Sequence, residues 1–114
     1  MKTVTIDVRT LADTLSDVAE AMDTLTPSEP RISFETPELL WKVLTAKRWE
    51  ILKTMTGAGP LAIREIARRV GRDVKAVHGD VHALLNAGLL DKAEDGRVVF
   101  PYDAVHVDFV LKAA

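Results

Sequence analysis

The spacing of apolar side chains changes from strand-like to helical within the N-terminal part of the chain. Residues 3–8 alternate polar and apolar side chains, several of them β-branched, which predicts a short strand. The next apolar residues follow a helical period: Leu11, Leu15, Val18, Met22 and Leu25. Acidic residues fill the other faces, so we expect an amphipathic helix of about four turns. Pro27 and Pro30 end it, and here we place the boundary between an N-terminal arm, residues 1–30, and a body, residues 31–114.

The first half of the body predicts one strand and two helices. Residues 32–35 are typical of a short strand, and residues 37–44 of a helical turn or two. Thr45 is a suitable N-cap for a helix over residues 46–56, because its hydroxyl can accept a hydrogen bond from the first turn. Residues 57–60, Gly-Ala-Gly-Pro, then break the chain.

The next segment predicts two helices separated by a tight turn. The shorter helix carries apolar residues at positions i, i+3, i+4 and i+7, namely Ile63, Ile66, Ala67 and Val70. Gly71 can close this helix in a left-handed conformation, and Asp73 can cap the longer helix that follows. The longer helix again keeps a helical period at Val74, Val77, Val81, Leu84 and Leu85, and Gly88 ends it.

The C-terminal part predicts strands. Leu89-Leu90 and residues 98–100 flank a polar turn, residues 94–97, whose Asp-Gly pair is a strong hairpin signal. Residues 105–111 alternate apolar and polar side chains, which predicts a final half-buried strand. The pattern as a whole predicts a mainly helical α+β fold with a strand–helix arm at its N-terminus.

Charge is distributed unevenly along the chain. The total of 15 basic and 17 acidic residues gives a net charge of −2, which by itself disfavours a nucleic-acid partner. Residues 1–45, however, contain four basic and eight acidic residues, whereas residues 46–88 contain eight basic and four acidic residues. This asymmetry indicates a basic working surface with an acidic appendage.

The composition also excludes several classes of protein. The chain has no cysteine, which excludes disulfide scaffolds, Cys-ligated zinc and thiol catalysis. Charged residues soon follow Met1, and no apolar run is long enough to cross a bilayer. We therefore expect a cytoplasmic protein without a signal peptide or a membrane partner.

Helix, short helix, tight turn, longer helix and hairpin is the element order of a winged helix-turn-helix. The chain resembles winged-helix transcriptional regulators of bacteria and archaea, of the MarR and ArsR type, over residues 59–100, GPLAIREIARRVGRDVKAVHGDVHALLNAGLLDKAEDGRVVF. With the flanking LTAKRWEILKTMTG and PYDAVHVDFVLKAA, it resembles a narrower family of small DNA-binding proteins over residues 31–114. Members of that family are often encoded beside a toxin, so the resemblance implies a nucleoid-associated antitoxin that represses its own promoter. Ala62 departs from the family, which usually has a capping Ser or Thr at this position.

The helix over residues 74–87 has the two faces that a recognition helix needs, one packed on the domain and one free to enter the major groove. Arg and Lys can contact guanine or phosphate, and the helix N-terminus favours phosphate. Outer arginines of the preceding helix suit phosphates, and a hairpin-tip arginine suits a phosphate or the minor groove. The candidate contacts to double-stranded DNA are Arg64, Arg68, Arg69, Arg72, Lys75, His78, Gly79, His82 and Arg97. The alternative is that they form a solvated helix face.

Two residues of this helix leave alternatives open. Gly79 costs about 1 kcal/mol relative to Ala in a helix, so either a DNA backbone or a neighbouring helix comes close to it. Asp80 would repel phosphate, and it could instead pair with an arginine or accept from cytosine N4.

The sequence predicts neither a metal site nor an enzyme. His78 and His82 have the i, i+4 spacing that can chelate a metal, but His106 is the only other histidine and cysteine is absent. No phosphate-binding glycine loop, nucleophile elbow or catalytic triad is recognisable. We expect no cofactor.

The acidic arm suggests a protein partner, with candidate contact residues Asp13, Leu15, Asp17, Val18, Glu20 and Met22. The arm could join two copies into a homodimer that reads a palindromic site. It could also cover a small toxin, such as a ribonuclease whose basic site attracts the carboxylates. The apolar members could also simply pack on their own domain. A different class of function is a protein–protein interaction module that has the winged-helix shape but no DNA role.

Aromatic side chains fall in apolar patterns along the body. We interpret Phe34, Trp41, Trp49, Phe100 and Phe109 as core or dimer-interface anchors.

Overall fold

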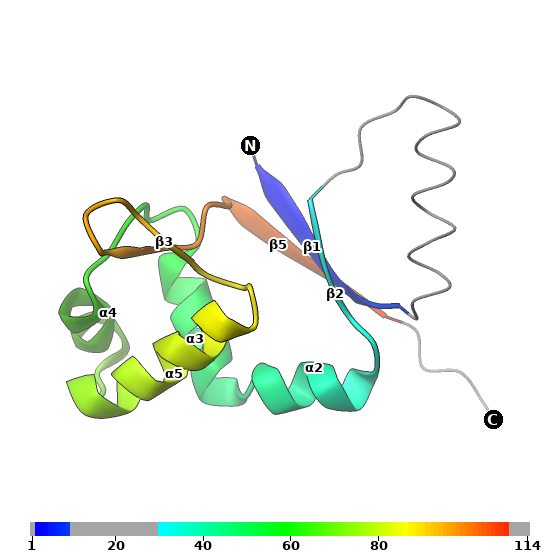
Figure 1. The fold of residues 1–114 in the computed structure, drawn as a ribbon, viewed down its shortest axis with the longest axis horizontal. Helices are drawn as coiled ribbons and strands as arrows, with labels where there is room; N and C mark the ends of the chain where they lie inside the picture. The colour runs from blue at the N-terminus through cyan, green and yellow to red at the C-terminus, as the bar shows by residue number, and fades with distance from the viewer. Residues whose placement is uncertain (1, 10–29, 110–114) are drawn as a thin grey trace.

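The computed structural model describes residues 2–9 and 30–109. Strand β1, Thr3–Val8, lies in the middle of a three-stranded sheet of order β2-β1-β5 (Figure 1). Its neighbours are β2, Arg31–Phe34, and β5, Ala104–Asp108, and both pairings are parallel. The predicted arm helix and all six candidate partner contacts on it lie outside the described residues.

The sheet has one apolar and one polar face, because successive residues of a strand point to opposite sides. Val4 and Ile6 are fully buried on the apolar face, where Ile6 pairs with Ile32 of β2 and Val107 of β5. On the polar face Asp7 accepts hydrogen bonds from the side chains of Arg31 and Ser33. The apolar face joins the sheet to the same hydrophobic core as the helices.

The strand at residues 3–8 is confirmed, but its partners differ from our interpretation. We grouped it with the arm, whereas β1 is the central strand between two strands of the body. Its pairing with β5 joins the two ends of the described chain, and short-range periodicity carries no signal of such a pairing. A boundary at residue 30 would separate β1 from the sheet that it completes.

Two helices lead from the sheet into the helical part of the molecule. Helix α2 is Pro37–Val43, and Thr36 caps it by accepting from the Leu39 N–H at 3.2 Å. Helix α3 is Ala46–Met55, and Thr45 accepts from the Arg48 N–H at 3.3 Å, which confirms the predicted cap.

The two helices predicted around Gly71 are both present. Helix α4 is Ile63–Val70, and Gly71 follows it in a left-handed conformation with φ of 69°. Helix α5 is Val74–Asn86, and the Asp73 carboxylate accepts from the first-turn N–H groups of Lys75 at 3.0 Å and Ala76 at 3.4 Å. At the start of α4, Ala62 makes no side-chain cap, as its methyl group requires.

A short hairpin follows α5. Strand β3, Asp91–Lys92, pairs antiparallel with β4, Val98–Val99, and Val98 also exchanges two backbone hydrogen bonds with Leu61, of 2.8 and 2.9 Å. The prediction of a strand at Leu89-Leu90 was wrong by two residues. Both leucines are buried in the core just before β3, so their apolar character reflects burial and not pairing.

The described residues form a small α+β fold. The core is continuous from the sheet through α2 and α3 to α4, α5 and the hairpin. The final strand ends at Asp108, and the side chain of Val107 is 40% exposed, so β5 is less buried than the alternation predicted. None of the helices described for this chain is long and apolar enough to cross a membrane.

Candidate nucleic-acid interface

Helix α5 has one buried and one exposed face. Val77, Val81 and Leu84 are fully buried against the core. On the opposite face, Lys75, His78 and Gly79 are exposed, and His82, one turn after His78, is partly exposed. In Figure 1, α4, α5 and the hairpin occupy the end of the molecule away from the sheet. The face of α5 that was predicted to point away from the domain is therefore accessible.

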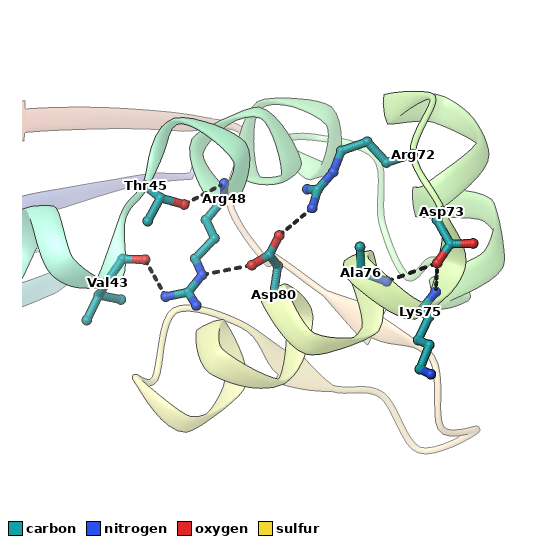
Figure 2. A network of polar contacts seen from close by, with 8 residues as sticks. All are labelled: Val43, Thr45, Arg48, Arg72, Asp73, Lys75, Ala76 and Asp80. Atoms are coloured by element: carbon teal, nitrogen blue, oxygen red, sulfur yellow. Dashed lines mark hydrogen bonds and ion pairs between the residues drawn. The ribbon is translucent and has the colours of Figure 1, made fainter.

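Asp80 joins three segments around the start of α5 (Figure 2). Its Oδ1 accepts from Arg48 Nε of α3 at 3.1 Å, and its Oδ2 accepts from Arg72 Nη2 of the turn at 2.8 Å. Arg48 also donates from Nη1 to the Val43 carbonyl at the end of α2, at 3.0 Å. The network holds α5 against the helix that precedes the helix-turn-helix segment.

The electrostatics of Asp80 favour an ionised carboxylate. The side chain is only 18% exposed, and burial by itself raises its pKa. The hydrogen bonds from Arg72 and Arg48, together with their charges, outweigh burial and hold the pKa of Asp80 below its ordinary value. Pairing with arginine was one of the alternatives for Asp80, and the structure confirms it.

Arg72 was predicted to contact DNA, but the structure turns it inward. Its side chain is 22% exposed and its guanidinium is committed to Asp80. The sequence did not identify Arg48, because it lies 32 positions from Asp80 on a helix with no recognisable DNA motif. Arg48 and Arg72 therefore hold α5 in place through Asp80, and their guanidinium groups are engaged within the protein.

Two of the three arginines of α4 share one carboxylate. Glu65 accepts two hydrogen bonds from Arg68, three positions later, one of them from Nε at 3.0 Å, and a third from Arg69 Nε at 3.0 Å. The bonds from Arg68 and then Arg69 lower the pKa of Glu65 to about 2, and the bonds to Glu65 raise the pKa of Arg68. Arg64 is exposed and, among the described residues, forms no ion pair. Glu65 thus neutralises part of the positive charge that the sequence assigned to this helix.

The two histidines of α5 contact each other. Their Nε2 atoms are 3.1 Å apart and their ring centroids 4.2 Å apart. A hydrogen bond at this distance requires one Nε2 to donate a proton and the other to accept it with its free electron pair. Within residues 2–9 and 30–109, no cluster of three or more possible metal ligands is present.

Gly79 lies in open space on the exposed face. A Cβ atom built on it would meet nothing within 4 Å, apart from its own helix backbone and chain neighbours. The alternative that a neighbouring helix requires this glycine is therefore wrong for the described residues. The other alternative, that a DNA backbone comes close to Gly79, stays a prediction.

Arg97 folds back on the hairpin. Its Nε donates to Asp95 at 2.6 Å and its Nη1 to the Pro60 carbonyl at 3.4 Å. The Arg97 backbone N–H and side chain both lower the pKa of Asp95. Half of the Arg97 side chain is still exposed, so a phosphate could compete with Asp95 for it.

The structure thus divides the predicted DNA contacts into two groups. The accessible residues without an ion pair among the described residues are Arg64, Lys75, His78, Gly79 and His82. The residues with a carboxylate partner are Arg68, Arg69, Arg72 and Arg97. The accessible group centres on the outward face of α5.

Comparison with known proteins identifies a family. The fold defines the chain as a small α+β protein, in which four described helices and a two-stranded hairpin are joined to a three-stranded parallel sheet. The HVO_A0114 family model matches residues 43–107, more than half of the chain, and the chain belongs to this family. No curated protein and no solved structure matches it. The matched segment runs from the last residue of α2 into β5 and does not include β1.

Proposed function

We propose that this chain is a sequence-specific double-stranded DNA-binding repressor in which residues 45–100 act as a winged helix-turn-helix. The main support is the outward face of α5, which is exposed over Lys75, His78 and Gly79 while its opposite face is buried. The recognition helix of such proteins needs both features, because it must be held by the domain while its side chains enter the major groove.

Three further observations agree with this proposal. Three residues separate α4 from α5, with Gly71 in a left-handed conformation, as is typical of a helix-turn-helix. The backbone bridge between Leu61 and Val98 attaches the hairpin to the start of α4, and in our proposal the hairpin has the role of the wing. The Asp80 network holds α5 in a fixed position relative to α3. A helix that contacts bases needs such support, because its side chains must be held in a precise geometry.

The resemblance to antitoxins supports a narrower version of the function. In this version the protein represses its own promoter and neutralises a small toxin, such as a ribonuclease, through the acidic residues of the arm. Co-purification with the product of a neighbouring gene tests this version. Removal of residues 10–29 is a less suitable test, because the segment connects β1 to β2.

DNA binding is measured best by fluorescence anisotropy with labelled promoter DNA over a series of salt concentrations. Lys75→Ala removes an exposed cation from α5, and Lys42→Ala removes one from α2 as the matched control. Loss of one phosphate contact reduces the slope of log K against log salt by about 0.9. We expect this reduction, with weaker binding, for Lys75→Ala alone. Equal effects of the two variants, or no binding at low salt, would contradict the proposal.

A protein–protein interaction module is the second candidate function. The observation that favours it is that Glu65, Asp80 and Asp95 pair with most of the arginines that were predicted to meet DNA. This candidate predicts that a partner protein is captured without any salt-dependent affinity for DNA.

A further inference from the structure

Strand β5 is an edge strand of the sheet. Among the described residues, β1 pairs with one side of β5 and no strand pairs with the other side. The Ala104 N–H donates to the Lys2 carbonyl beside β1 at 3.3 Å. Backbone groups of alternate residues point the same way, so those of His106 and Asp108 also face β1. Those of Val105 and Val107 face outward, where they can pair with another strand.

The apolar face next to this edge is also uncovered. Trp41 is 58% exposed, Val107 40% and Phe109 36%, and the Trp41 and Phe109 rings meet edge to face at 5.7 Å. A groove of about 540 Å³ adjoins them, lined by Leu40, Trp41, Leu44, Ala46, Trp49 and Val107. Contiguous exposed apolar surface beside an open strand edge is typical of an interaction site.

We infer that β5 pairs with β5 of a second copy of this chain, antiparallel and centred on Val107, to form a continuous six-stranded sheet. A strand that pairs with its own copy about a two-fold axis is necessarily antiparallel and isologous. This inference concerns the sheet and does not depend on the proposed DNA-binding function.

The charges along β5 favour a second copy of this chain as the partner and favour the alignment centred on Val107. With Val107 opposite Val107 of the partner subunit, His106 lies opposite Asp108 of the partner subunit, and the symmetric pair forms as well. Centring on Asp108 would place two carboxylates opposite each other, and centring on His106 would leave Asp108 opposite an alanine. If one strand were shifted by one residue relative to the other, the outward-facing backbone groups of one strand would lie opposite residues whose backbone groups face β1. Such an alignment could not form the hydrogen bonds of a regular antiparallel pair. The Val107 alignment alone pairs both charges.

The same alignment would also cover the exposed apolar side chains beside β5. It places Phe109 of the partner subunit opposite Val105, and Val107 against its symmetry mate. Val105 lines a second hollow with Trp49 and Leu52, next to the groove beside Val107. The dimer therefore covers apolar side chains that a single copy leaves exposed.

Charge exchange tests the pairing. Sedimentation equilibrium of the full chain, which has a mass of 12.5 kDa, should show a concentration-dependent dimer in the absence of DNA. H106D places carboxylates opposite each other, and we expect the dimer dissociation constant to rise about tenfold. The double variant H106D/D108K restores opposite charges and should return the constant toward that of the original chain. Circular dichroism checks that each variant is folded.

Cysteine cross-linking tests the alignment, because the chain has no cysteine of its own. V107C should form an intersubunit disulfide on oxidation, since its symmetry mate lies directly opposite. D108C is the matched control and should not, because it faces residue 106 of the partner subunit. A monomer at every concentration, a dimer indifferent to H106D, or preferential cross-linking of D108C would overturn the inference.

Discussion

The helical unit, residues 45–100, and the sheet are built in opposite ways. The helical unit is one continuous stretch of chain, and its caps and turn form between residues a few positions apart, such as Asp73 with Lys75. The sheet unites β1 near the N-terminus with β5 near the C-terminus. The comparison shows that a local pattern can specify one part of a small protein while the other depends wholly on distant contacts.

The two regions also differ in how they use charge. In the helical unit, carboxylates hold most of the arginines in internal pairs, so few arginines are left to meet an external anion. At the sheet, the exposed side chains of Trp41 of α2, Val107 and Phe109 lie near β5, one edge of which pairs with no described strand. We propose accordingly that the helical unit meets DNA and that the sheet meets a second copy.

The largest expected effect comes from the centre of the sheet. Ile6 is fully buried and contacts the core shared with the helices. Ile6→Ala should lower the free energy of unfolding by about 3 kcal/mol, because it leaves a cavity. Urea denaturation followed by circular dichroism measures this, with Thr5→Ala on the opposite face as the control. We expect one cooperative transition, and survival of helical signal after loss of the sheet would show instead that the two regions fold independently.

The next effect concerns the junction within the helical unit. Asp80→Ala leaves Arg48 and Arg72 partly buried without their carboxylate, so we expect a loss of about 2 kcal/mol. Asp80→Asn keeps the shape and part of the hydrogen bonding, and it should lose less. If α5 is held by packing alone, both variants will unfold at the same denaturant concentration as the original chain.

The Asp80 contribution should depend on pH. Pairing lowers the pKa of Asp80 below its ordinary value of 3.8 in the folded state. The stabilisation is therefore fully present above that value and is lost as the pH falls through the lower folded pKa. The stability difference between the original chain and Asp80→Asn should shrink in this acidic range. A difference that is constant between neutral and acidic pH would contradict the pairing.

The smallest effect separates stability from binding on α5. Because a Cβ at Gly79 meets nothing within 4 Å, Gly79→Ala should stabilise the free protein by up to about 1 kcal/mol. If a DNA backbone approaches this position, the same methyl group should weaken promoter binding. Thermal unfolding and fluorescence anisotropy measure the two quantities. Unchanged DNA affinity would show that no backbone comes close to Gly79.

Local sequence signals predicted most of the described elements and the exposed face of α5. Thr45, Gly71 and Asp73 mark helix ends by chemistry that acts within a few residues, and each is found where the pattern placed it. The exposed side of α5 followed from its helical period. The commitment of Arg72 to Asp80 could be stated only as an alternative, because it depends on how α3 packs beside α5.

The sequence by itself determined the helices, their caps, the hairpin and the concentration of positive charge in residues 46–88, because these features depend on neighbouring residues. Only the tertiary structure decided that β1 joins the sheet of the body, that Arg48 and Arg72 neutralise Asp80, and that β5 is an edge strand among the described residues. The physical reason is the same in each case. Pairing between distant strands and ion pairs between separate helices depend on where packing of the core brings those segments together.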